Sequence, residues 1–134
     1  MIAGIWLRLL LAVTGTAVTV TTLDQASGDL ATPVTFLAVV LVTWVVARPG
    51  SASAAVLICG ALLLQLVNHG TEVDAAVFAL IVLLPLLHVG AALAAVLPAT
   101  GSVEWAALRP SVMRYAAAVG VTCAVAVLVR LTVA

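Results

Sequence analysis

The stretch "AAVFALIVLLPLLHVGAALAAVL" (residues 75–97) decides the fold. It contains no charged residue, and its one ionisable side chain is His88. An α-helix rises about 1.5 Å per residue and the hydrocarbon core of a bilayer is about 30 Å thick, so roughly 20 apolar residues cross it as a helix. In lipid the backbone has to satisfy its own hydrogen bonds, which a helix does. Residues 75–97 therefore predict a membrane-spanning helix.

The whole chain has the same character. Its 134 residues are 66% hydrophobic and 7% charged, and the mean hydropathy is +1.38. A water-soluble domain needs more polar side chains than this to cover its surface. Five basic and five acidic residues give a net charge of zero, so no nucleic-acid partner is expected. The sequence predicts an all-α, polytopic membrane helix bundle, with residues 1–134 as a single domain in the lipid bilayer and no soluble domain.

Breaks rich in Gly and Pro divide the chain into five apolar segments. The predicted spans cover residues 5–22, 30–47, 52–67, 75–97 and 112–134. Segment 52–67 is the shortest, so four spans are the alternative. The first segment is expected to be retained as a span, because "TTLDQASGD" (residues 21–29) contains no clear signal-peptide cleavage site.

The charged residues indicate an orientation. If Arg8 and the N-terminus are cytoplasmic, four of the five arginines fall on the inner side, Arg109 and Arg114 in one loop, and four of the five acidic residues fall outside. Arg130 is the exception among the arginines. Positive residues in short cytoplasmic loops set orientation. We expect five spans in a bacterial cytoplasmic membrane, with the N-terminus inside and the C-terminus outside. The use of Arg without Lys is typical of high-GC bacterial genomes.

Small residues spaced four apart allow membrane helices to approach closely. They predict packing faces on the fourth and fifth segments, whose partner lies in this chain or in another protein. The predicted helix-packing residues are His88, Ala91, Ala95, Ala116, Gly120 and Ala124.

The first segment carries several threonines. Their hydroxyls are expected to bond to the backbone one turn earlier, with a hydrophilic pathway as the alternative. They are Thr14, Thr16, Thr19, Thr21 and Thr22.

His88 has a local structural explanation. Pro85 has no N–H, so the carbonyl of Ile81 loses its helical partner. His88 lies seven residues after Ile81 on nearly the same helix face, and helical side chains lean back toward the N-terminus. We therefore expect a neutral imidazole that donates to the Ile81 carbonyl at a helix–helix contact.

The sequence contains few residues that could bind a metal ion or a haem. Cys59, His88 and Cys123 lie at roughly the same depth, and thiolates with imidazole suit a soft metal. They remain candidates, but no metal site is predicted, because no ligand spacing lies within one helix. A bis-histidine haem would need His69, roughly 20 Å away in depth. With no catalytic motif in the sequence, neither a cofactor nor enzymatic activity is expected.

The acidic residues of the outer loops are expected to be solvated, with a cation site as the alternative. They are Asp24, Asp29, Glu72 and Asp74.

Residues 98–115 form the longest predicted connection. Ser102 is expected to cap a short interfacial helix that carries Trp105, and Ser111 to cap the fifth span. Trp105 and Tyr115 fit an interfacial aromatic belt. The connection either lies flat on the inner leaflet or docks a cytoplasmic partner.

The stretch "LLHVGAALAAVLPATGSVEWAALRPSVMRY" (residues 86–115) resembles the span and loop of small actinobacterial membrane proteins encoded beside MoxR-type AAA+ ATPases. This resemblance implies an accessory role in a membrane-associated assembly and no site residues. The first hypothesis is a non-enzymatic structural or accessory subunit of a larger inner-membrane complex, whose partners are other membrane subunits. The alternatives are a small channel or carrier that acts as a homo-oligomer, and a haem- or metal-binding redox subunit. No predicted span contains a carboxylate, which disfavours a coupled transporter.

Overall fold

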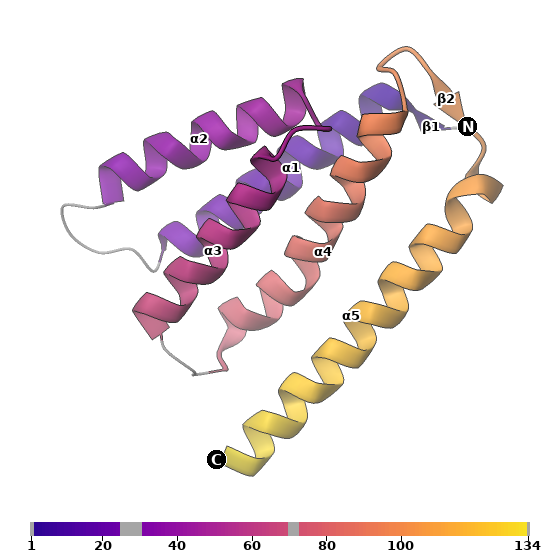
Figure 1. Ribbon diagram of the computed structural model, residues 1–134. Helices are drawn as coiled ribbons and strands as arrows, with labels where there is room; N and C mark the ends of the chain where they lie inside the picture. The colour runs from indigo at the N-terminus through magenta and orange to yellow at the C-terminus, as the bar shows by residue number, and fades with distance from the viewer. Residues whose placement is uncertain (1, 25–30, 70–72, 134) are drawn as a thin grey trace.

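The computed structural model describes residues 2–24, 31–69 and 73–133, and within these residues the chain forms five α-helices and one pair of short strands (Figure 1). The all-helical class is thereby confirmed for the described residues. The elements are β1 (Ile2–Ala3), α1 (Gly4–Leu23), α2 (Ala31–Ala47), α3 (Ser53–His69), α4 (Ala75–Val96), β2 (Ser102–Val103) and α5 (Trp105–Val133).

Three of the described helices, α1, α4 and α5, are long and apolar enough to cross a membrane. They have 20, 22 and 29 residues. Helices α2 and α3 are equally apolar in character but have 17 residues each, which corresponds to about 25 Å of helix. The structure therefore supports a membrane protein with at least three helices of spanning length.

Helices α1 to α4 pack into one body whose core lies between them. Side chains from all four helices meet in the larger cluster, so α1 and α4 contact each other along much of their length and α2 and α3 close the core around them. The cluster consists of Leu7, Leu11, Val45, Ala54, Leu57, Leu87, Ala91 and Ala94. A smaller cluster of Val18, Ala61, Leu80 and Leu84 extends the core toward the far end of the bundle.

Close approach of helices depends on two glycines in the bundle. A Cβ placed on Gly90 of α4 would lie 3.1 Å from the Leu11 side chain of α1, and one placed on Gly15 of α1 would lie 3.1 Å from the Val42 methyl groups of α2. Leu11 is almost completely buried. The absence of a side chain at these two positions therefore sets the distance of α1 from its neighbours.

A strand pair that the sequence did not predict ties the N-terminus to the α4–α5 connection. β1 and β2 are antiparallel, with Ile2 opposite Val103 and Ala3 opposite Ser102. The Gly4 N–H continues the pairing by donating to the Gly101 carbonyl at 2.8 Å. The predicted cap at Ser102 is therefore wrong, because Ser102 is part of a strand.

The fifth helix begins earlier than predicted, at Trp105 instead of residue 112. It is one continuous helix with Pro110 inside it, so the separate interfacial helix and the predicted cap at Ser111 are both wrong. Pro110 removes one hydrogen bond, to the carbonyl of Ala106. Near its start the helix buries Leu108, which holds the first turns onto the bundle and offsets that loss.

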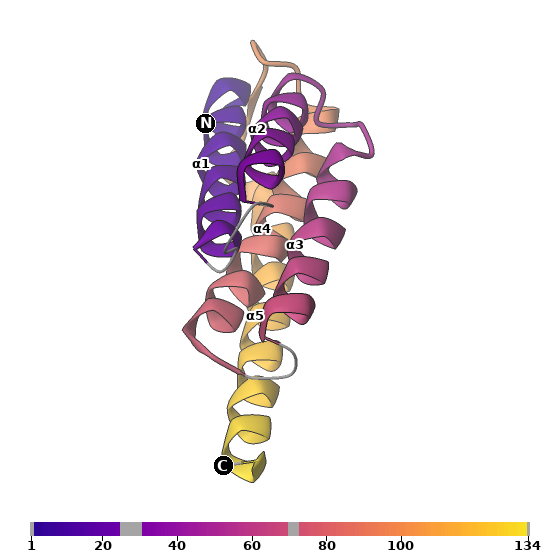
Figure 2. The same ribbon diagram turned by 90° about the vertical axis from the view of Figure 1, so that its left-hand side faces the viewer.

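Helix α5 lies at the edge of the bundle. It runs beside α4, and its C-terminal part continues past the start of α4 at the end of the bundle opposite the N-terminus (Figures 1 and 2). Leu108 is the single buried residue among residues 105–133 of this helix. We use "N-terminal end of the bundle" for the end that holds β1, residues 48–52 and residues 97–104.

The packing at Gly90 can be tested by substitution. Gly90→Leu should lower the free energy of unfolding by about 1–3 kcal/mol, because the added side chain meets Leu11 in a packed core. Gly60→Leu is the matched control, since a Cβ at Gly60 meets nothing within 4 Å. Unfolding of the purified protein in mixed detergent, followed by circular dichroism, measures both. Equal losses for the two variants would contradict the α1–α4 contact.

Candidate functional site

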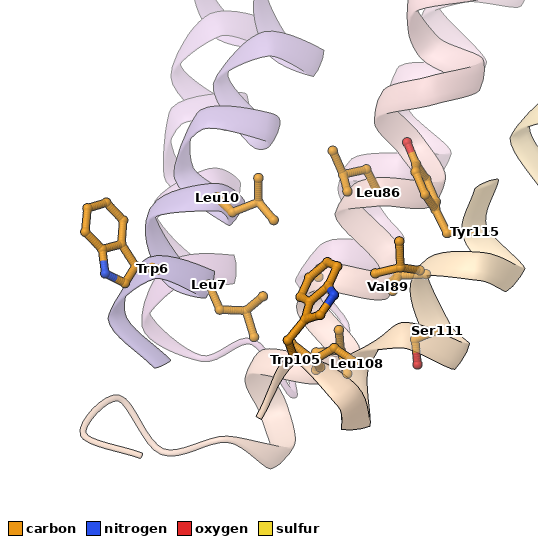
Figure 3. A pocket seen from close by; sticks show the side chains of 12 residues that line it. Trp6, Leu7, Leu10, Leu86, Val89, Trp105, Leu108, Ser111 and Tyr115 are labelled. Carbon is orange, nitrogen blue, oxygen red and sulfur yellow. The ribbon is translucent and has the colours of Figure 1, made fainter. Parts of the chain in front are cut away.

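Several polar side chains lie along the line of contact between α4 and α5, which we call the seam, and they are not helix caps or threonines bonded to their own helix. On one side of this seam, α1, α4 and α5 enclose an apolar groove of about 320 Å³ (Figure 3). The Trp105 ring stands between α1 and α4, close to Leu10 and Val89 (Figure 3). The groove is lined by apolar side chains apart from Ser111 and Tyr115. An apolar chain such as a lipid acyl chain suits this surface, but none of the lining residues is charged.

A second groove of about 340 Å³ lies along the other side of the same seam. Its walls include four polar side chains, one from α4 and three from α5. They are His88 of α4 and Ser111, Arg114 and Tyr115 of α5. We refer to it as the polar groove.

Tyr115 forms the hydrogen bond that joins the two helices. Its hydroxyl donates to the carbonyl of Val82 at 2.9 Å. Val82 follows Ile81, whose carbonyl Pro85 leaves without a helical donor. The polar contact at the proline turn therefore comes from α5. Tyr115 lies within α5, and its predicted place in an interfacial belt stays a prediction.

His88 does not make the predicted bond. The side chain is exposed, and it forms no hydrogen bond with any residue in the described part of the chain. The predicted bond to the Ile81 carbonyl is therefore absent, and the exposed imidazole lines the polar groove. His88 still borders α5 across the groove.

Arg114 lies inside a helix and not in the predicted inner loop. It is nine residues beyond Trp105, or about 13 Å along α5. Trp6, Trp44 and Trp105 are all exposed near the N-terminal end of the bundle. Tryptophan favours the membrane–water interface, so this end is expected at an interface and Arg114 well beneath it. A charge near the centre of a membrane helix costs about 2.5–3.5 kcal/mol.

Two other arginines have partners within the chain. The Arg8 guanidinium donates to the Val46 carbonyl at 3.0 Å, and that of Arg48 lies over the Trp44 ring, 5.5 Å from its centroid. Arg114 is exposed, and among the described residues it has no hydrogen bond or ion pair. Arg109 and Arg130 of α5 likewise have no such partner among the described residues, but they lie near the two ends of the helix, whereas Arg114 borders the polar groove opposite the middle of α4.

Gln65 is a buried polar residue that the sequence analysis missed. It is 8% exposed, and neither its amide nitrogen nor its amide oxygen has a hydrogen-bond partner among the described residues. It borders a cavity of about 210 Å³ together with Ile81, Pro85 and Thr122. A lone glutamine within an apolar segment was the available signal.

The predicted helix-packing residues have different environments. Ala91 is buried in the main core, and Ala95 is exposed beside Gly50. The three residues of the fifth segment lie exposed on one flank of α5, so their partner remains a prediction. They are Ala116, Gly120 and Ala124.

The candidate metal ligands do not come together. The described residues contain no group of three or more His, Cys, Asp or Glu side chains suited to a metal ion. Cys59 is exposed on α3 and Cys123 is partly buried on α5. The side chain of His69, which a bis-histidine haem would need, lies outside the described residues.

The structure describes two of the four candidate acids, and they have different environments. Asp24 is exposed after α1, whereas Asp74 caps α4, accepting from the Val77 N–H at 3.0 Å. Asp29 and Glu72 lie outside the described residues. The structure thus assigns Asp74 a structural role.

The threonines of α1 return their hydroxyl bonds to the backbone, as predicted. Each donates to the carbonyl four residues earlier, at 2.7–2.9 Å. The hydroxyls of Thr14, Thr16, Thr19, Thr21 and Thr22 are therefore satisfied within the helix.

Comparison with known proteins gives no relative: no protein-family model, no curated protein and no solved structure matches the chain.

Substitutions of Tyr115 and His88 are expected to affect the stability of the protein to different extents. Tyr115→Phe should lower the free energy of unfolding by about 0.5–1.5 kcal/mol, because it removes the bond to Val82. His88→Leu should change it by less than about 0.5 kcal/mol, because the side chain is exposed. Detergent unfolding curves compare the two. A larger loss for His88→Leu would favour the bond to Ile81 that the sequence suggested.

Gln65→Leu should stabilise the protein. The change removes two buried polar atoms without partners, which corresponds to about 1–3 kcal/mol. Asn68→Leu, an exposed position one turn along α3, is the matched control and should have little effect. Thermal unfolding in detergent measures both. A lower midpoint for Gln65→Leu would mean that the amide is hydrogen-bonded in the folded protein.

Proposed function

We propose that this protein is a non-enzymatic accessory subunit of a larger bacterial inner-membrane complex, and that α5 is the surface on which it assembles. The observation that carries the proposal is the environment of α5. Helix α1 buries eight residues and α4 buries six, whereas α5, the longest of the three, buries Leu108 alone. A helix with so little contact to its own chain is available to others.

The exposed flank of α5 suits contact with another helix. In lipid there is no hydrophobic force between helices, so association depends on close packing across small residues. Ala116, Gly120 and Ala124 form such a face, and a Cβ added to Gly120 would meet nothing within 4 Å. These residues leave room for a partner backbone.

The topology that we propose has five spans, with the N-terminus inside. The pairing of β1 with β2 supports it, because the N-terminus and the α4–α5 connection then lie on one side and an even number of helices lies between them. The bond from Arg8 to Val46 likewise brings the end of α2 to that side. Helices α2 and α3, with 17 residues each, lie at the lower limit of spanning length, about 17 residues.

The resemblance of residues 86–115 to actinobacterial membrane proteins encoded beside MoxR-type ATPases supports the same role. This stretch covers the second half of α4, the strand β2 and the start of α5. It therefore includes the seam and the attachment of α5, and in such an assembly it would carry the contact to other subunits.

The second candidate, a small channel or carrier acting as a homo-oligomer, has the buried Gln65 amide and its cavity in its favour. The satisfied threonine hydroxyls of α1 weaken it, because they leave that helix without free polar groups for a solute path.

One experiment separates the two candidates. The tagged protein is purified from native membranes in mild detergent and its mass and composition are measured. Stoichiometric chains of other proteins support the accessory role. A homo-oligomer without other chains, and with solute flux in liposomes, would overturn it.

The face at Gly120 can be tested in the same purification. Gly120→Leu should reduce the recovered partner at least about tenfold, because the new side chain fills the space that a partner backbone needs. Gly60→Leu places the same side chain in open space on α3 and should leave recovery unchanged. Full recovery with Gly120→Leu would exclude this flank from the contact.

A further inference from the structure

The polar groove on the α4–α5 seam holds a cation, Arg114, that has no ion pair with any residue of ranges 2–24, 31–69 and 73–133. Arg114 borders it on α5, opposite Pro85 and His88, which are the eleventh and fourteenth of the 22 residues of α4. The register of the two helices therefore places Arg114 at the middle of α4. The excess length of α5 lies at its other end, where the helix continues past the start of α4 (Figures 1 and 2).

No helix of this chain can supply the missing anion. The five described helices contain no Asp or Glu. Glu104 precedes α5 and is ten residues from Arg114, or about 15 Å along the axis. In a second copy with the same orientation, the described helices also offer no carboxylate at the level of Arg114. Pairing with another copy therefore does not neutralise the charge.

A lipid phosphate is a poor match in depth. The three exposed tryptophans mark the expected interface at the N-terminal end of the bundle, and Arg114 lies about 13 Å along α5 from Trp105. The side chain leans toward that end, but it is shorter than this distance. Phosphates lie at or above the level of the tryptophans, so the guanidinium stops short of them.

The surroundings of Arg114 suit a carboxylate on a packed helix. The His88 imidazole and the Ser111 hydroxyl line the same groove and can donate hydrogen bonds. Ala92 and Ala118 also line it, and both are small and exposed, so another backbone can come close. Arginine pairs with carboxylates through two parallel N–H donors, which fixes the geometry of the contact.

We propose that the polar groove binds a membrane helix of a different protein, and that this helix carries an Asp or Glu that pairs with Arg114. The inference rests on the proposed role of α5 in assembly and names the chemistry of the partner. It makes the complex a heteromer, because the described helices of this chain hold no such carboxylate. The groove lies on the flank of α5 opposite to Gly120. The contact at Arg114 and the contact at Gly120 can therefore be tested separately.

A defined probe tests the pairing without the native partner. The purified protein is reconstituted in phosphatidylcholine vesicles with a synthetic Leu- and Ala-rich transmembrane peptide that carries one Glu at the depth of Arg114. A matched peptide carries Gln. Energy transfer between dyes on the protein and on the peptide reports binding. The Glu peptide should bind about tenfold more tightly than the Gln peptide.

Variants assign the preference to Arg114. Arg114→Gln should abolish it and Arg114→Lys should keep part of it, whereas Arg109→Gln, an exposed arginine of the same helix outside the groove, should keep it in full. Arg114→Glu should instead prefer a peptide that carries Lys. Circular dichroism confirms that each variant is folded. Equal binding of the Glu and Gln peptides, or a preference that survives Arg114→Gln, overturns the proposal.

Two further outcomes separate the alternatives. Vesicles that contain phosphatidylglycerol test whether a lipid occupies the groove. If the preference for the Glu peptide is lost in these vesicles, and if anionic lipid stays bound to the wild type but not to Arg114→Gln, the groove binds a lipid. That result overturns the proposal. The accessory role is tested independently by the native purification and Gly120→Leu. It therefore stands if partner chains are recovered while the peptides show no preference.

Discussion

The structure depends on one constraint, that polar groups surrounded by hydrocarbon must find partners within the protein. Helix formation meets it for the backbone. Where a proline interrupts the α4 ladder, the Tyr115 hydroxyl reaches the neighbouring carbonyl of Val82. Near the start of α1, the carbonyl of Val46 in α2 accepts a hydrogen bond from Arg8. Polar residues that meet the constraint hold helices together, whereas Gln65 and Arg114 have no hydrogen-bond partner in the part of the chain that the structure describes.

The four-helix body and α5 meet this constraint with different kinds of contact. Helices α1 to α4 interlock through Leu, Val and Ala side chains, with glycines where backbones come nearest. Helix α5 buries only Leu108, near its start, and the Tyr115 hydroxyl bonds to α4. One face of α5 is half-buried as far as Ala126, and the remaining faces of the helix are exposed.

Sequence reasoning located the helices because their boundaries depend on composition. Residues 75–97 predicted α4 to within one residue, and the apolar runs 5–22 and 30–47 predicted α1 and α2 almost as well. The same reasoning could not predict the register of the helices, which is the position of each helix along the axis of its neighbour. That register comes from side-chain shapes in three dimensions, so the depth of Arg114, the role of Tyr115 and the burial of Gln65 were not readable. The start of α5 was missed because Pro110 and the charges of residues 104–114 are typical of a loop.

The strand pair at the N-terminal end has a consequence for folding. β1 precedes α1 and its partner β2 follows α4, so the pair joins two segments that are far apart in the chain, with four helices between them. Closing so long a loop costs conformational entropy, which the packing of the helices inside the loop has to offset. We therefore expect the pair to form together with the four-helix body and not ahead of it.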